Sequence, residues 1–299
     1  MNILVTGGTV FASRFTAEYF YNKKNNVYVL NRGNHIQPSN VIHIQGDRHH
    51  LGNILKKHHF DAVLDITAYN YDDVKLLTEG LGTFDSYILV SSSAVYPETL
   101  KQPFHEQQQC GANHYWGDYG KNKLAAEQYV TENIENAYII RPPYLYGPMN
   151  NLYREAFVFE CAENNLPFCI PKNGKMPLQF FHIRDMCRFI DILLDKHPSQ
   201  QIFNVGNAEI IDINKWVELC YHVLNKKPEI KYIDGSVPQR CYFPFLDYSY
   251  VLDITRQNEL MKNTIPLFDG LCESYEWYKN NRELIRRKPL IDYINQNLM

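Results

Sequence analysis

The chain has 299 residues, 45% of them hydrophobic, which suffices for one large domain or two closely joined ones. Its formal net charge of −3 creates no overall field that would attract nucleic acid or anionic lipid. No apolar run approaches the roughly 18 to 20 residues that span a bilayer, and the opening MNILVTGG has no charged, cleavable leader, so we expect neither membrane nor nucleic-acid partners.

Cysteine and histidine patterns argue against disulfides and metal sites. The seven cysteines are widely scattered and contain no CxxC pair, which favours reduced thiols in a cytoplasm. The doublets at 49–50 and 58–59 place histidines next to each other, and adjacent residues do not share a helix face. No cysteine or carboxylate cluster frames either doublet, so we expect no metal site.

The first half of the chain alternates short apolar runs with helical patterns. The expected strands are residues 2–6, 26–31, 41–45, 61–66, 86–92 and 137–141. The expected helices are 12–22, 70–81 and 115–134. The strand runs are too continuously apolar to have a wet face, which is typical of a parallel sheet covered on both sides. We therefore predict an α/β fold, a doubly wound parallel Rossmann sheet, over residues 1–150.

After residue 148 the alternation loosens. The expected helices are 151–164, 183–195, 213–226 and 267–283, with short strands at 168–171, 202–206 and 229–233. No repeat or Pro/Gly linker separates this part from the first. Residues 151–299 are thus expected to form a smaller substrate-side lobe that sends some chain back to the Rossmann domain.

The stretch VTGGTVFAS, residues 5–13, joins the first strand to the first helix and resembles a phosphate-binding glycine loop. Gly7 and Gly8 stand where a tight turn and a close phosphate approach need them, and Val10 and Ser13 replace two further glycines. Backbone N–H groups at such a helix start can bind a pyrophosphate. A plain strand-to-helix turn is the alternative. We expect a working site in which Val10 alters the phosphate contacts.

The ends of the next two strands predict the adenosine half of that site. Asn31 and Arg32 follow the second strand, where an acidic residue would bind the ribose 2′-hydroxyl and repel a 2′-phosphate. An arginine there favours NADP over NAD, unless Arg32 is only a solvated turn residue. Asp47 follows the third strand, where it can meet an adenine amino group.

A serine, a tyrosine and a lysine predict acid–base chemistry. Tyr119 and Lys123 are four residues apart on an expected helix and therefore share a face. An ammonium beside a phenol lowers the tyrosine pKa towards a useful range. Three serines, 91–93, end the strand at 86–92, at the carboxyl edge of the sheet where ligands of open α/β folds bind. The serine can hold a substrate oxygen while Tyr119 moves its proton and a nicotinamide exchanges hydride.

With these motifs in place, the chain resembles the extended short-chain dehydrogenase/reductase superfamily of the NAD-dependent epimerase/dehydratase type. The resemblance covers VTGGTVF, SSSAVYPE, YGKNK, RPPYLYGP and FFHIRD, and GGTVF, NRGN and GDR are more particularly similar to an atypical branch that includes RNA-binding members. It implies a catalytic set of Ser92, Tyr119 and Lys123. The cofactor residues we expect are Gly7, Gly8, Thr9, Val10, Phe11, Asn31, Arg32, Asp47, Arg48, Thr67, Tyr119, Lys123 and Pro142.

The resemblance implies hydride transfer on a hydroxyl or carbonyl of a sugar nucleotide or related small molecule, and a homodimer. Two departures bear on the substrate: Tyr144 replaces an asparagine, and Leu178 an arginine, that family members use for nucleotide sugars. Arg154 or Arg240 can substitute, although surface or salt-bridge roles are the ordinary ones for each. A nucleotide- or RNA-binding protein without turnover is the alternative function.

Overall fold

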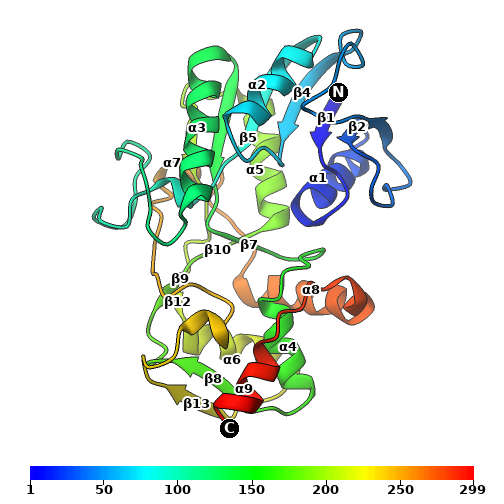
Figure 1. The fold of residues 1–299 in the computed structure, drawn as a ribbon. Coiled ribbons are helices and arrows are strands. Elements are labelled where there is room, and N and C mark those ends of the chain that lie inside the picture. The colour runs from blue at the N-terminus through cyan, green and yellow to red at the C-terminus, as the bar shows by residue number, and fades with distance from the viewer.

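The computed structural model describes residues 1–299 and has a seven-stranded parallel sheet as its centre. The strand order is β11-β6-β5-β4-β1-β2-β3 (Figure 1). The strands are β1 (Asn2–Thr6), β2 (Asn26–Asn31), β3 (Ile42–Gln45), β4 (His59–Asp65), β5 (Thr83–Val90), β6 (Ala137–Arg141) and β11 (Ile202–Asn204). The doubly wound fold predicted from the sequence is confirmed, with strand ends that differ from the prediction by a few residues.

Helices cover both faces of the sheet because alternate strand residues point to opposite sides. Ile3 and Val5 of β1 pack with α1 (Phe11–Asn22) and α5 (Ile183–Lys196). Leu4 packs on the other side with α2 (Tyr71–Gly80) and α3 (Asp118–Asn133). The strands are apolar on both faces, and therefore a layer of helices covers each face of the sheet.

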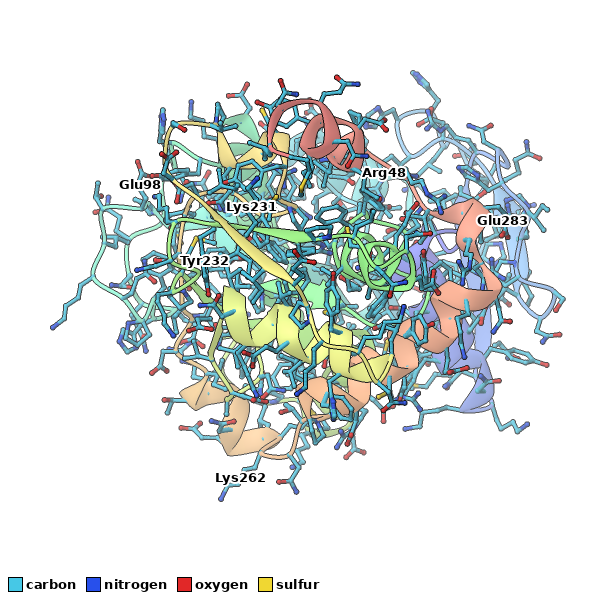
Figure 2. All side chains as sticks on the ribbon, turned by 90° about the horizontal axis from the view of Figure 1, so that it is seen from below. Arg48, Glu98, Lys231, Tyr232, Lys262 and Glu283 are labelled. Carbon is cyan, nitrogen blue, oxygen red and sulfur yellow. The ribbon has the colours of Figure 1, made fainter.

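The lobe formed mainly by residues 151–299 lies at the carboxyl ends of the strands, and the C-terminus lies at the end of the lobe that is away from the sheet (Figure 1). Its helices are α4 (Glu155–Glu163), α6 (Ile213–Val223), α8 (Leu267–Asn280) and α9 (Leu290–Asn297). Its strands are β8 (Phe168–Pro171), β9 (Pro177–Leu178), β12 (Ile211–Asp212) and β13 (Ile230–Ile233), and short helical turns are η2 (Gln239–Cys241) and η3 (Arg282–Leu284). These elements enclose a core of their own around Trp216. Seen from below, the lobe lies in front, with Lys231 and Tyr232 on β13 (Figure 2).

Chain from the second half returns to the sheet. Strand β11 pairs with β6, and α5 packs beside α1. Helix α5 packs there because one of its faces is apolar. The buried stripe at helical spacing consists of Met186, Phe189, Ile190 and Leu193. The remaining elements are β7 (Tyr144–Tyr146), β10 (Phe180–His182), α7 (Thr255–Leu260) and η1 (Ser93–Val95), and β7 pairs with β10. The boundary at residue 150 stays a prediction.

No helix combines the length and the apolar character that crossing a membrane requires.

Candidate active site

A cleft runs along the carboxyl edge of the sheet and consists of two adjoining cavities. A cavity of ≈ 380 Å³ lies beside the glycine loop, and a larger one of ≈ 710 Å³ lies between the sheet and the lobe. Tyr69 lines both cavities, so they adjoin at this side chain. Tyr69 follows the end of β4 and precedes Asn70, whose side chain accepts from the Asp73 amide and begins α2. The sequence prediction missed Tyr69, although its place just beyond a predicted strand end was the signal.

The glycine loop has the close packing that its two glycines predict. Gly7 has φ 86° and Gly8 φ 72°, conformations that other residues rarely adopt. A Cβ on Gly7 would lie 2.6 Å from Thr67 Cγ2, and one on Gly8 would lie 2.2 Å from Val29 Cγ1. Glycine is therefore required at both positions, which keeps the backbone of the loop accessible at the strand end.

Val10 precedes α1 and lies outside both cavities. Its backbone is extended, with φ −135°, which any residue adopts, and its side chain lines neither cavity. Ser13 is buried and donates to the Val10 carbonyl at 3.0 Å, so it supports the helix start. Phe11 begins α1 with φ 37°, an uncommon conformation for a bulky residue, and lines the larger cavity. The valine therefore does not obstruct the cleft.

The predicted adenosine residues gather in the smaller cavity. Asn31, Arg32 and Asp47 all line it. The Asn31 amide is already engaged: it donates to the Gly7 carbonyl at 2.7 Å and accepts from the Gly33 amide at 2.8 Å. Asn31 thus holds the following loop against the glycine loop. Arg32 forms no side-chain hydrogen bond or ion pair, which leaves its guanidinium available to a ligand.

Arg48 has a structural role that the sequence prediction did not anticipate. Its guanidinium lies 2.9 Å from Asp65 Oδ1 in a buried ion pair and also donates to Thr67 at 3.0 Å. Thr6 and Tyr87 donate to the same Asp65 carboxylate at 2.7 and 2.6 Å. Although burial opposes the charge, Arg48 and these donors hold the Asp65 pKa below its usual range. Arg48 therefore shapes the cavity wall, and its charge is neutralised by Asp65.

The three serines that end β5 have different environments. Ser91 is buried and donates to Glu127, which is in a buried ion pair with Arg141. Ser93 is buried, and its backbone amide donates to the Pro142 carbonyl at 3.0 Å. Only Ser92 is partly exposed, and it lines the larger cavity together with Tyr119. The geometry therefore favours Ser92 over its neighbours, which are committed to the structure.

Tyr119 and Lys123 both line the larger cavity, but they interact differently from the expectation. The Lys123 ammonium donates to the carbonyls of Ala68 and Val90 at 2.7 and 2.9 Å. Burial raises the pKa of Tyr119, the nearby Ser92 hydroxyl opposes that rise, and Lys123 does not contribute. The expected lowering of the tyrosine pKa by Lys123 is wrong for this structure. Burial lowers the pKa of Lys123 itself to about 8.

Most of the predicted cofactor residues reach the cleft. Those that line it are Gly7, Thr9, Phe11, Asn31, Arg32, Asp47, Arg48, Thr67, Tyr119, Lys123 and Pro142. Gly8 and Val10 line neither cavity. The Asp47 carboxylate accepts from the His49 amide at 3.0 Å, which lowers the Asp47 pKa. It is therefore ionised and able to accept from an amino group.

The larger cavity also contains groups that the sequence prediction missed or weighed differently. Its wall is rich in aromatic side chains, among them Tyr115, Trp116 and Tyr250. Arg154 and Arg240 line it and form no ion pair, so the ordinary salt-bridge roles weighed for them do not hold. No aspartate, glutamate or histidine lines this cavity. The groups able to move a proton there are therefore tyrosine, serine and lysine.

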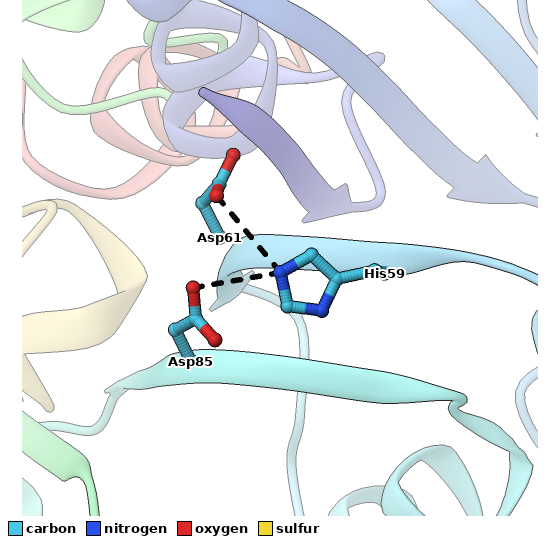
Figure 3. A group of neighbouring side chains, drawn as sticks. All are labelled: His59, Asp61 and Asp85. Carbon is cyan, nitrogen blue, oxygen red and sulfur yellow. Dashed lines mark ion pairs between the residues drawn. The ribbon is translucent and has the colours of Figure 1, made fainter.

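One cluster of metal-ligand side chains lies away from the cleft. His59 Nε2 is 3.5 Å from Asp85 Oδ2 and 4.0 Å from Asp61 Oδ1 (Figure 3). Its Nδ1 is hydrogen bonded to Thr83 Oγ1 at 2.8 Å. These residues sit at the amino ends of β4 and β5, at the sheet edge opposite the cleft. They therefore play no part in the chemistry of the cleft.

Comparisons with known proteins agree with this geometry. Residues 75–206 match the model of the NAD dependent epimerase/dehydratase family. Among curated proteins, the chain is 25% identical over 300 residues to the chloroplast stem-loop binding protein of 41 kDa b from Arabidopsis thaliana, covering 91% of this chain and 78% of that protein.

Two solved structures share the fold at 18% identity. The dTDP-glucose 4,6-dehydratase of Bacillus anthracis, in complex with NAD, matches with a TM-score of 0.74 over 97% of this chain and 99% of that one. The UDP-glucose 4-epimerase of Thermotoga maritima, with UDP-glucose, has a TM-score of 0.74 over 94% and 100%. Residues 75–206 thus resemble the NAD dependent epimerase/dehydratase family, and the whole chain shares the fold of the two solved enzymes, in agreement with the sequence resemblance.

Proposed function

We propose that the protein is an NAD(P)-dependent enzyme that transfers hydride to or from a carbon bearing a hydroxyl or carbonyl in a small molecule. The observation that carries the proposal is the placement of Ser92, Tyr119 and Lys123 together in the wall of the larger cavity. That cavity adjoins the cavity beside the glycine loop at Tyr69. A substrate oxygen and a dinucleotide can therefore occupy one cleft.

The residues present fit a dinucleotide. Gly7 has no side chain where a Cβ would meet Thr67 at 2.6 Å, and the backbone of the following residues opens onto the smaller cavity. The pyrophosphate would be held by the glycine loop and the adenosine by the walls around Asp47. A nicotinamide supplies a hydride acceptor or donor. We propose NADP over NAD because the Arg32 guanidinium, without a protein partner, suits a 2′-phosphate.

The chemistry of the site's own residues is proton transfer at one oxygen. In the reducing direction, the Tyr119 hydroxyl donates its proton to the carbonyl oxygen as the C–H bond forms. In the oxidising direction the ionised phenol accepts the hydroxyl proton as that C–H bond breaks. Ser92 binds the same substrate oxygen, and Lys123 holds the strand ends beside it. Since burial raises the Tyr119 pKa, the resting tyrosine is protonated and ready as an acid.

The pocket favours epimerisation or simple redox chemistry over dehydration. Eliminating water next to a carbonyl needs a base for the C–H proton and an acid for the departing hydroxyl, besides the acid–base group of the redox step. No carboxylate or histidine lines the larger cavity to supply them. A sugar nucleotide is the proposed substrate, supported by the solved epimerase that carries UDP-glucose.

Two further proposals concern the cellular compartment and the oligomeric state of the enzyme. The cysteines are all free thiols and four of them are buried, which supports the cytoplasm predicted from the sequence. The homodimer that the resemblance implies is kept as a proposal.

A calorimetric titration tests the function against its alternative. NADP, NAD and a structured RNA are each titrated at two salt concentrations, together with Arg32→Glu protein. We expect NADP to bind most tightly and Arg32→Glu to reverse the preference towards NAD. If both dinucleotides fail to bind and RNA binds with a steep salt dependence, the protein is the nucleic-acid-binding alternative suggested by the name of its Arabidopsis relative.

A substrate screen then follows. Sugar nucleotides and small carbonyl compounds are tested by nicotinamide absorbance and by product NMR. NMR is needed because an epimerase returns its hydride and leaves no net absorbance change.

A further inference from the structure

The amino edge of the sheet brings a histidine and two aspartates together from neighbouring parallel strands. His59 begins β4, and its register partner on β5 is Thr83. Asp61 and Asp85 each lie two residues further along the same two strands. One ligand atom from each of the three side chains lies within 4.8 Å of the other two (Figure 3). The pairing of the strands therefore sets the spacing of the three groups.

The distances between these groups suit a shared ion better than a direct contact. His59 Nε2 lies 3.5 Å from Asp85 Oδ2 and 4.0 Å from Asp61 Oδ1. Both distances exceed the roughly 2.7–3.2 Å of a good hydrogen bond. Zinc binds nitrogen and carboxylate oxygen at about 2.0–2.2 Å in tetrahedral geometry, which separates two ligand atoms by about 3.3–3.6 Å. Modest side-chain rotations would therefore bring the three groups to the spacing of a zinc site.

Hydrogen bonds from outside the cluster orient two of the ligands. His59 Nδ1 lies 2.8 Å from Thr83 Oγ1. When Nδ1 donates to this hydroxyl, the free lone pair of the ring is on Nε2, the nitrogen that faces both carboxylates. Asp61 Oδ2 accepts from the backbone amide of Asn2 at 2.5 Å, which leaves Oδ1 facing His59. Metal-binding histidines and carboxylates are held by outer contacts of this kind.

No lysine or arginine neutralises the two carboxylates. Neither Asp61 nor Asp85 has a lysine or arginine nitrogen within 4.0 Å. Asp85 also lines a groove of ≈ 500 Å³ together with Glu135 and His197, and no lysine or arginine lines that groove. Like charges held close together repel each other, and a cation between them relieves the repulsion. This part of the amino edge therefore favours a positively charged ligand.

We propose that His59, Asp61 and Asp85 bind one zinc ion, which cross-links the amino ends of β4 and β5. Imidazole nitrogen and carboxylate oxygen are both usual ligands of zinc, whereas Mg²⁺ and Ca²⁺ prefer oxygen alone. Water would complete the coordination, since all three side chains are partly exposed. No metal site was expected from the sequence, because only strand pairing brings Asp85 beside His59. The inference is independent of the proposed function, because the cluster lies at the sheet edge opposite the cleft.

Calorimetry with zinc chloride tests the site. Zinc is titrated into chelator-treated wild-type protein and into His59→Ala, Asp85→Asn and Thr83→Val. Loss of an outer contact typically lowers metal affinity about 10- to 100-fold, which is the effect expected for Thr83→Val, and loss of a ligand in the other two variants should cost more. His58→Gln is the matched control. It changes the other histidine of the doublet, whose ring stacks on Phe60, and should leave the zinc affinity unchanged.

Two further measurements separate this site from zinc bound elsewhere. Zinc should raise the melting temperature of the wild type and of His58→Gln but not of Asp85→Asn, because an ion that binds the folded state stabilises it. Cobalt(II) in place of zinc should give visible absorption without the near-ultraviolet band of a thiolate ligand, since the cluster contains no cysteine.

Three results would overturn the zinc site. The first is a wild-type protein that does not bind zinc. The second is equal zinc affinity in the wild type and in Asp85→Asn, which would mean that the ion binds elsewhere. The third is a cobalt spectrum with a thiolate band, which would assign the ion to cysteine.

Discussion

The ammonium group of Lys123 donates a 2.7 Å hydrogen bond to the carbonyl oxygen of Ala68. A second bond, 2.9 Å long, joins it to Val90 at the end of β5. The lysine therefore ties α3 to two neighbouring strand ends, and it lies 5.4 Å over the ring of Tyr69. It builds the floor of the cleft while Tyr119, one helical turn away, faces the substrate side.

Lys123→Met should change how stability depends on pH. Burial lowers the Lys123 pKa to about 8 in the folded protein, compared with about 10.4 in an unfolded chain. Between these values the unfolded state binds more protons, so Lys123 makes the free energy of unfolding rise with pH, by up to about 1.4 kcal/mol per pH unit. Denaturant unfolding from pH 7 to 10 should show wild type gaining stability relative to the variant across this window. A constant difference between the two proteins would show that Lys123 titrates as an exposed lysine.

Asp65→Asn should strongly destabilise the fold. The substitution leaves the Arg48 guanidinium buried without its counter-charge, and breaking a buried pair in this way costs about 3–5 kcal/mol. Urea unfolding measures the loss. The matched control is Glu18→Gln, which breaks the exposed Arg14–Glu18 pair and should cost less than about 1 kcal/mol. Equal effects of the two substitutions would contradict the role given to Asp65.

Ser91→Ala and Ser92→Ala should separate stability from turnover. Ser91 donates to the buried Glu127, so its loss should lower the free energy of unfolding by about 1–3 kcal/mol. Ser92 borders the cavity, so its loss should lower kcat with little change in stability. Thermal unfolding and steady-state kinetics on both variants check the assignment. Normal turnover by Ser92→Ala would remove this serine from the mechanism.

Gly7→Ala and Val10→Gly should have opposite consequences for cofactor binding. The added methyl group at Gly7 would meet Thr67 at 2.6 Å and force a residue with φ 86°, so both stability and NADP affinity should fall. Val10→Gly removes a side chain that lines neither cavity and should leave the affinity nearly unchanged. Calorimetry on both variants tests this. Clearly tighter binding by Val10→Gly would show that the valine does hinder the phosphate contacts.

The sequence predicts the fold well because local patterns determine it. Unbroken apolar runs identify the parallel strands, and their alternate residues divide between two helix layers, as Leu4 and Val5 do. The two-residue strands β9 and β12 were not predicted, since they carry no periodic pattern and depend on tertiary contacts.

The sequence predicted which residues lie near the site, but it did not predict which groups their charged side chains contact. Spacing places Tyr119 and Lys123 on one helix, but only the folded structure shows the lysine bound to carbonyls of two strand ends. Arg48 follows a predicted strand, yet its pairing with Asp65 depends on a neighbouring strand. Arg286 and Lys288 belong to a charged stretch that suggests a solvated surface until the lobe folds back on the cleft.

The kinetics of Tyr119→Phe test the central claim most directly. The substitution removes only the phenolic oxygen, so folding and NADP affinity should stay near wild type. With a substrate from the screen, product formation followed by NMR should slow by about 10²–10⁴-fold. The change of rate with pH that reports the ionisation of Tyr119 in the wild type should be absent from the variant. Turnover at the wild-type rate by a folded Tyr119→Phe protein that binds NADP would contradict hydride transfer assisted by this tyrosine.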